Sequence, residues 1–183
     1  MQPAPFIRIL PLFAVLLFAG CGGDSSRQSD SGGGNTAVQP KALKIIEPCQ
    51  LITEEDAAKL VGEAVKPADK SEQPVVGMKL CMYNPASGEP IPFLQVSLTQ
   101  DAFFPPGGVG TASIYKSLKD NFEGMRTDVE GVGDEAFITS GGIYIIADGY
   151  YIQIAGGNTS NPAIREKLIE AGKIAVAKLK TLK

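Results

Sequence analysis

Residues 137–154 read FITSGGIYIIADGYYIQI, and this stretch decides the fold. It contains the pairs Gly141-Gly142 and Asp148-Gly149, which are typical of two-residue turns between antiparallel strands. The stretch therefore predicts a meander of three strands. The Asp148-Gly149 turn places Ile145 opposite Ile152.

The turns also assign the side chains of the meander to two faces, because successive residues of a strand point to opposite sides. The Gly141-Gly142 turn places Ser140 opposite Ile143 and Ile138 opposite Ile145. One face then consists of Ile138, Ile143, Ile145, Ile152 and Ile154. The other consists of Phe137, Tyr144, Ile146 and Tyr151, with Thr139 and Gln153. Both faces are too apolar for water, so we expect helices, or a partner, on each side of the sheet.

Further elements precede and follow the meander. Residues 79–83 and 93–100 read as strands, and three helices are expected: one from the capping box at 53–56 to Gly62, one over 111–125, and one that begins at Asn161-Pro162. This order predicts an α+β domain, in which an antiparallel sheet of about five to six strands is flanked by about three helices.

The N-terminal region points to an exported protein. An apolar run over 9–19 follows Arg8 and leads through small residues to Cys21. This layout resembles a bacterial lipoprotein signal, with a signal peptide at 1–20 and lipidation of Cys21. The run is too short to span a bilayer. Gly22 after the cysteine resembles the pattern for export to the outer membrane in a bacterium with two membranes.

A tether is expected between the lipid and the domain. Residues 21–41 hold the cysteine and then a Gly/Ser-rich segment that has too little apolar surface to fold. Such a segment reaches about 25 Å. The remaining residues, 42–183, are expected to form one globular domain. The formal net charge of −3 argues against nucleic acid as a partner, because phosphate requires clustered Lys and Arg.

Two cysteines remain, Cys49 and Cys81. An exported domain with one such pair is expected to oxidise it to a structural disulfide. The alternatives are a redox pair and a metal site. The separation does not fit C-x-x-C, and the chain has no histidine to complete a common zinc site. We therefore expect neither a metal nor another cofactor.

Several short motifs resemble a family of small bacterial envelope lipoproteins of unknown function. They are Pro48-Cys49, the stretches 51–55 and 60–62, Cys81-Met82-Tyr83, and GVGDEAF at 131–137. Some members of that family resemble the PsbP-like α/β/α sandwich, an antiparallel sheet between helices. The resemblance covers about residues 47–181. It implies this fold and brings no catalytic residues with it.

Catalysis has few candidates in this sequence. The absence of histidine removes the usual general base and the Ser-His and Cys-His systems. The carboxylates Asp101, Asp134 and Glu135 remain, although the last two read as solvated acids in a tight turn before a strand. We assign no catalytic residue and expect no enzyme.

Binding has two aromatic candidate groups. Phe103 and Phe104 lie in a Pro/Gly-rich loop and either rim a pocket or wedge under the second helix. Tyr144 and Tyr151 share a face of the sheet and either form a recognition surface or contact a helix in the core. Arg165 and the lysines of the last helix either face anionic lipid headgroups or form a solvated helix face.

These features together favour a membrane-anchored envelope lipoprotein. Its domain is expected to be a non-catalytic binding or accessory module for an envelope protein or a small ligand. One alternative is a carboxylate-based enzyme or an accessory subunit of an envelope enzyme. Another is a carrier of an apolar ligand, with a cavity lined by Phe137, Ile146 and Tyr151.

Overall fold

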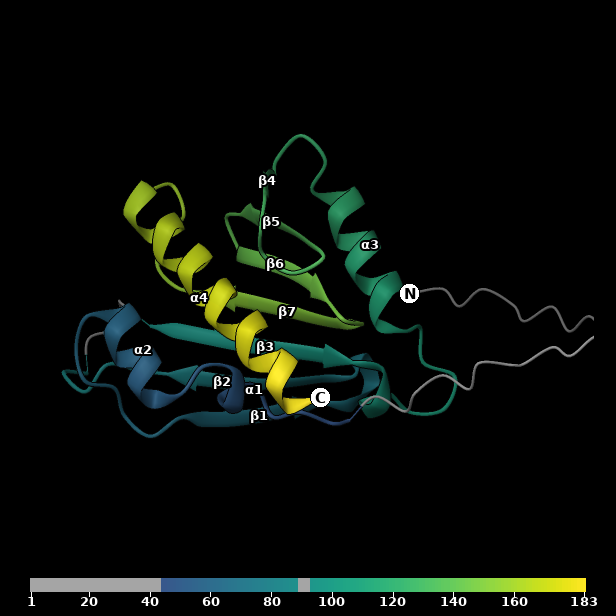
Figure 1. Cartoon of the computed structure of the whole chain (residues 1–183), viewed down its shortest axis with the longest axis horizontal. Coiled ribbons are helices and arrows are strands. Elements are labelled where there is room, and N and C mark those ends of the chain that lie inside the picture. The colour runs from purple at the N-terminus through teal and green to yellow at the C-terminus, as the bar shows by residue number, and fades with distance from the viewer. Residues whose placement is uncertain (1–43, 89–92) are drawn as a thin grey trace, which may run out of the picture. The chain divides into compact units, whose positions relative to one another are not determined.

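The computed structural model describes residues 44–88 and 93–183. The predicted signal peptide 1–20, Cys21 and the tether 21–41 lie outside the described residues. The described part folds around one antiparallel sheet of seven strands in the order β1-β2-β3-β7-β6-β5-β4 (Figure 1). The strands are β1 (Asp69–Gln73), β2 (Met78–Tyr83), β3 (Leu94–Gln100), β4 (Thr127–Val129), β5 (Glu135–Thr139), β6 (Gly142–Ala147) and β7 (Tyr150–Ala155).

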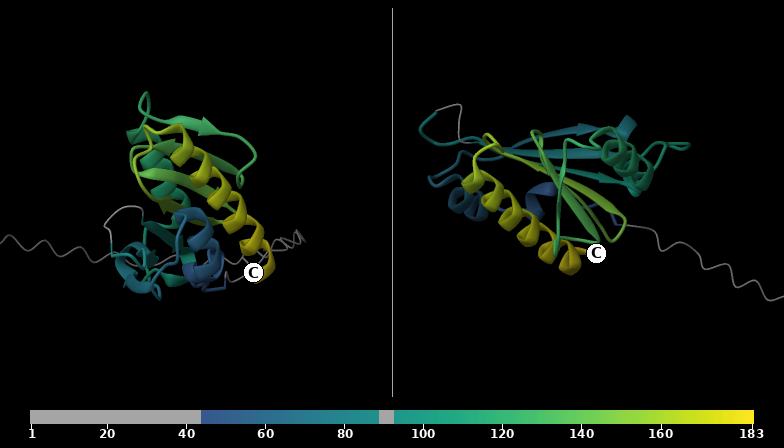
Figure 2. Two further views of the ribbon diagram at one scale, coloured as in Figure 1. Left: turned by 90° about the vertical axis from the view of Figure 1, so that its left-hand side faces the viewer. Right: turned by 90° about the horizontal axis from the view of Figure 1, so that it is seen from above.

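Helices cover both faces of this sheet. They are α1 (Pro48–Leu51), α2 (Glu54–Val61), α3 (Thr111–Asn121) and α4 (Pro162–Leu182), with short 3₁₀ turns η1 (Pro74–Val76) and η2 (Asp101–Phe103). Figure 2 shows α2 and α4 on one side of the sheet and α3 on the other. The α+β class with an antiparallel sheet between helices is confirmed.

The sheet has more strands than the five to six expected. Both additional strands, β1 and β4, lie at its edges. All five residues of β1 are polar and exposed, so no alternation of apolar and polar residues marks it as a strand. Strand β4 is only three residues long. A one-turn helix, α1, was also not expected.

The two faces of the meander are as predicted, but one register is not. Ile145 lies opposite Ile152 as expected, whereas Ile138 pairs with Ile143 rather than with Ile145. The correction is a shift of two residues, which leaves every side chain on its predicted face. Its cause is Gly142, which joins β6 rather than the turn. Gly142 has φ +115°, and a Cβ there would lie 2.2 Å from the carbonyl oxygen of Ile154 on β7.

The main core lies between the isoleucine face of the meander and the helices α1, α2 and α4. The five isoleucines are at most 3% exposed. Leu168, Ala171, Ala175 and Leu179 of α4 pack on them, as the helical spacing predicts.

Helix α3 is shorter than the expected 111–125. It ends at Asn121, and the chain turns through Gly124 at φ +75° to enter β4, which leaves Met125 68% exposed.

A disulfide joins Cys49 of α1 to Cys81 of β2, as predicted. The two Cα atoms are 5.5 Å apart. Cys81 is fully buried in the main core, so the bridge fixes the N-terminal segment of the domain to β2, the strand next to the edge strand β1. Closing a loop of this length stabilises a fold by about 3–4 kcal/mol on the chain-entropy account.

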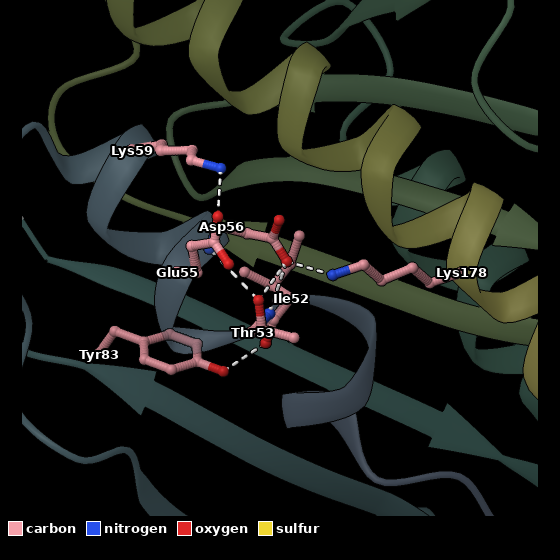
Figure 3. A network of polar contacts seen from close by, with 7 residues as sticks. All are labelled: Ile52, Thr53, Glu55, Asp56, Lys59, Tyr83 and Lys178. Atoms are coloured by element: carbon pink, nitrogen blue, oxygen red, sulfur yellow. Dashed lines mark hydrogen bonds and ion pairs between the residues drawn. The ribbon is translucent and has the colours of Figure 1, made fainter.

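A polar network around Asp56 ties α2 to α4 (Figure 3). The Asp56 carboxylate accepts hydrogen bonds from the N–H of Thr53 at 2.9 Å and from its hydroxyl at 2.6 Å, and it forms an ion pair with Lys178 of α4. Burial alone would raise the pKa of Asp56, but the hydrogen bonds from Lys178 and Thr53 outweigh it and lower the pKa to about 2. The hydroxyl of Tyr83 on β2 donates to the carbonyl of Ile52 in the same region.

The disulfide predicts a measurable loss of stability when it is removed. We expect the double variant Cys49→Ser/Cys81→Ser to lower the free energy of unfolding by about 3–4 kcal/mol in urea denaturation. The matched control is the unsubstituted protein with its disulfide reduced, which should lose the same amount. A loss below about 1 kcal/mol would mean that packing alone holds α1 on β2.

The Asp56 network predicts a pH-dependent effect. A carboxyl pKa below its usual 3.8 means that ionised Asp56 stabilises the fold above that pH, and that this stabilisation is lost as the pH falls from 3.8 towards about 2. We expect Asp56→Asn to cost about 1–2 kcal/mol at pH 7, measured by urea denaturation, with the deficit shrinking below pH 4.

Glu55→Gln is the matched control for this measurement. It removes an ion pair with Lys59 on the same helix whose side chains are 79% and 71% exposed, so its cost should be much smaller than that of Asp56→Asn. Equal costs for the two variants, or a deficit of Asp56→Asn that does not change with pH, would contradict the assignment.

Candidate functional site

Tyr144 and Tyr151 lie in the core beneath α3, each only 5% exposed. With Phe137 and Tyr115 of α3 they form a second cluster of buried residues, and Phe122 packs against it. The ring centroids of Tyr115 and Tyr151 are 5.8 Å apart. Burial raises the pKa of Tyr151 well above its ordinary value. The structure therefore places both tyrosines in contact with a helix, the second of the two alternatives.

The same rings occupy the space where an apolar-ligand cavity was expected. Phe137 is fully buried and stacks on Tyr144 with the ring centroids 4.9 Å apart. Tyr115 and Phe122 contact Phe137 from the side of α3. Side chains of this chain thus fill the region around Phe137 and Tyr151.

The three candidate carboxylates each hold local structure, and although Asp134 and Glu135 are neighbours in sequence, they bind different groups. Asp101 accepts a 2.7 Å hydrogen bond from the N–H of Thr111, the first residue of α3. Asp134 accepts a 2.8 Å hydrogen bond from the N–H of Asp148 and so fixes the turn between β6 and β7. Glu135 forms an ion pair with Lys119 of α3. No two of these carboxylates hydrogen-bond to a common group.

Phe103 and Phe104 are both half-buried but have different neighbours. The ring of Phe103 lies 4.9 Å from the ammonium group of Lys79 on β2. Hydrogen bonds to Glu47 and Glu72 raise the pKa of Lys79, which keeps this cation charged over the ring.

The ring of Phe104 lies between two loops and contacts both of them. Its ring lies so close to Gly77 and Gly108 that a Cβ on either glycine would come within 2.6 Å of it. Gly77 ends η1, and Gly108 lies in the loop that leads to α3. The ring therefore fits only because both backbone positions lack a side chain.

Exposed apolar side chains gather on these two loops. Val75 is 80% exposed, Val76 37% and Val109 67%. They account for three of the five large apolar residues that are strongly exposed in the described part of the chain. Beside them, Phe104 and the stretch 105–108 line an open hollow of about 380 Å³. We call Val75, Val76, Phe104 and Val109 the apolar tip.

The apolar tip lies at the end of the sheet where the described chain begins. The side-chain amide of Gln100, the last residue of β3 before the tip loop, makes two hydrogen bonds to the backbone of Ile46, at 2.8 and 2.9 Å. The hydroxyl of Tyr150 donates to the carbonyl of Lys44 at 2.8 Å. Ile45, between them, is 47% exposed. The segment from the N-terminal region thus reaches the domain beside the tip.

Sequence reasoning identified Phe103 and Phe104 but not the valines of the tip. The signal was present in Pro74-Val75-Val76-Gly77, where proline and glycine bracket two β-branched residues. That pattern marks a loop, but it does not show that the loop lies against Phe104.

Two further properties bear on the function. None of the helices in residues 44–88 and 93–183 combines the length and the apolar character needed to cross a membrane. Within the same residues, no three acidic or cysteine side chains are grouped as metal ligands.

The hydrogen bond of Asp101 predicts a structural rather than a chemical role. We expect Asp101→Ala to lower the free energy of unfolding by about 1 kcal/mol, measured by urea denaturation, because the first N–H of α3 loses its acceptor. Glu123→Ala is the control, since Glu123 is exposed and its side chain makes no hydrogen bond or ion pair to a described residue. Equal stability of the two variants would contradict the capping role.

Comparison with family models, with curated proteins and with solved structures finds no match for this chain. Its function is inferred from its own residues and their geometry.

Proposed function

We propose that this chain is a bacterial envelope lipoprotein, anchored through a lipid on Cys21, whose domain is a non-catalytic binding or accessory module. In a bacterium with two membranes the anchor lies in the outer membrane and the domain in the periplasm. The lipoprotein-like sequence before Cys21 and the tether support the anchor. The sandwich of helices around an antiparallel sheet is consistent with a PsbP-like domain, which is part of this proposal.

The observation that carries the binding role is the place of the apolar tip. Exposed apolar groups that gather on one surface are typical of interaction sites. The tether joins the domain at Lys44, next to the tip, so the distance between the tip and the bilayer is limited mainly by the tether. A reach of about 25 Å keeps this end of the domain near the membrane surface.

The partner that fits this arrangement is a protein at the membrane surface that presents an apolar site. Phe104 and the adjoining hollow offer a pocket beside three exposed valines, and interface cores favour such aromatic and aliphatic contacts. The anchor raises the effective concentration of the domain near such a partner, so a small contact area suffices for binding.

Photo-crosslinking in the host tests this proposal. A photoreactive residue at Val109 is expected to give an adduct with a protein of defined mass in intact cells. The matched control is the same residue at Met125, which is equally exposed at 68% against 67% but lies away from the tip. Equal adducts at both positions, or none at Val109, would contradict the tip as the docking site.

The anchor is tested in the same cells. We expect Cys21→Ser to release the protein from the membrane fraction and to weaken the Val109 adduct, because the domain loses its local concentration. A protein that stays membrane-bound after this change would contradict the lipid anchor. The crosslinking result would still show whether the apolar tip contacts a protein. An adduct of Val109 with a phospholipid would mean that the apolar tip contacts the bilayer and not a protein.

A further inference from the structure

A second hollow, of about 210 Å³, lies at the opposite end of the sheet from the apolar tip. It is formed where the β4–β5 pair, the turn between β5 and β6, and the loop from β7 into α4 meet. The residues that line it are mostly hydroxyl-bearing: Thr127, Thr139, Ser140, Thr159 and Ser160, with Met125, Ile138 and Arg165.

Arg165 is the only charged residue that lines this hollow, and it has no partner. Its guanidinium group makes no hydrogen bond or ion pair with any described residue, although the side chain is half-buried. The positions three and four residues away on α4 hold Asn161, Pro162, Leu168 and Ile169, so no acid on its own helix face balances it. No acidic side chain lines the hollow either.

Thr159 adds a hydroxyl group that is available to a ligand. Its side chain lines the hollow, the residue is only 9% exposed, and its hydroxyl makes no hydrogen bond to a described residue. The Thr159 hydroxyl is not fully removed from water, so it can donate a hydrogen bond to, or accept one from, a ligand that enters the hollow. The neighbouring Thr139 hydroxyl accepts from the N–H of Gly141 at 3.1 Å and keeps its own hydrogen for donation.

The first turn of α4 does not compete for the same ligand. The N–H of Ala163 is already bonded to the side chain of Asn161 at 3.0 Å, and the N–H of Ile164 to its carbonyl at 3.1 Å. Arg165 is therefore the only cationic group available to an anion in the hollow.

We propose that this hollow binds a small polyhydroxylated ligand that carries one oxyanion, of the kind found in sugar phosphates and sugar acids. The guanidinium of Arg165 matches a phosphate or carboxylate in a bidentate pair. The threonine and serine hydroxyls both donate and accept, as sugar hydroxyls require. Met125 and Ile138 supply an apolar wall for the C–H face of the ring. The volume suits one sugar unit, since it lies below the usual range of drug-sized pockets.

This site lies beyond the proposed docking role of the apolar tip and does not depend on it. The two occupy opposite ends of β3 and β7, because the tip follows Gln100 whereas the hollow adjoins the loop after Ala155. A domain that is tethered at one end would present this hollow away from its anchor.

Isothermal titration calorimetry of the full chain in detergent, in phosphate-free buffer, tests the proposal with glucose 1-phosphate, glucuronate and glucose as probes. We expect saturable binding of at least one anionic probe and at least about tenfold weaker binding of neutral glucose. Arg165→Gln should weaken the anionic probe by about tenfold or more, and Thr159→Val by about threefold or more. Neither side chain makes a polar contact within the described fold, so both variants should fold normally, which thermal unfolding checks.

Lys173→Gln is the matched control, because it makes the same change of charge on an exposed part of the same helix. It should bind the anionic probe as the unsubstituted chain does. The proposal is overturned if neither anionic probe binds saturably, if glucose binds as tightly, if Arg165→Gln binds normally, or if Lys173→Gln loses as much affinity. Preference between glucose 1-phosphate and glucuronate identifies the oxyanion as phosphate or carboxylate.

Discussion

The structure depends on the need to bury both faces of the β5–β6–β7 meander. The isoleucine face requires the long helix α4, and the aromatic face requires α3. A sheet that is apolar on two sides cannot stand with one side in water, so the chain must supply a layer to each face. The remaining elements follow from this arrangement. The 101–110 loop carries the chain from β3 to α3 on the far side of the sheet, and α1 and α2 extend the cover that α4 begins.

The elements with local signals were predictable. The turn at Asp148-Gly149 and the caps of α2 and α4 all depend on residues close together in sequence, and the structure has each of them. The register at Gly142 was not predictable in the same way. The close approach of its backbone to Ile154 involves a third strand, and a turn signal contains no information about that strand. Strand β1 was missed because its polar residues give no pattern and only pairing with β2 makes them a strand.

The candidate sites also divide into those that local sequence predicts and those that depend on residues far apart in the chain. The disulfide could be predicted from the number of cysteines and the expected compartment, whereas the roles of the carboxylates could not. In the sequence, Asp101 and Asp134 look available for catalysis. In the structure, each carboxylate accepts a hydrogen bond from a backbone N–H that only folding brings close to it. The reverse holds for Arg165 and Thr159. The sequence marks Arg165 only as one cation of the last helix and Thr159 not at all, and the hollow that they share forms only when the strands and α4 are placed together.

The attachment of the N-terminal segment also has a mechanical consequence. A pulling force on the N-terminal segment would first load the hydrogen bonds of Lys44 to Tyr150 and Leu182, and then the two between Ile46 and Gln100. Should these break, peeling would stop at Cys49, three residues further on, because its covalent bond passes the load to Cys81. Cys81 lies on β2, between β1 and β3, so the force would then be shared by several rows of backbone hydrogen bonds. The disulfide thus acts as a stop that would protect the rest of the domain from strain transmitted through the proposed anchor.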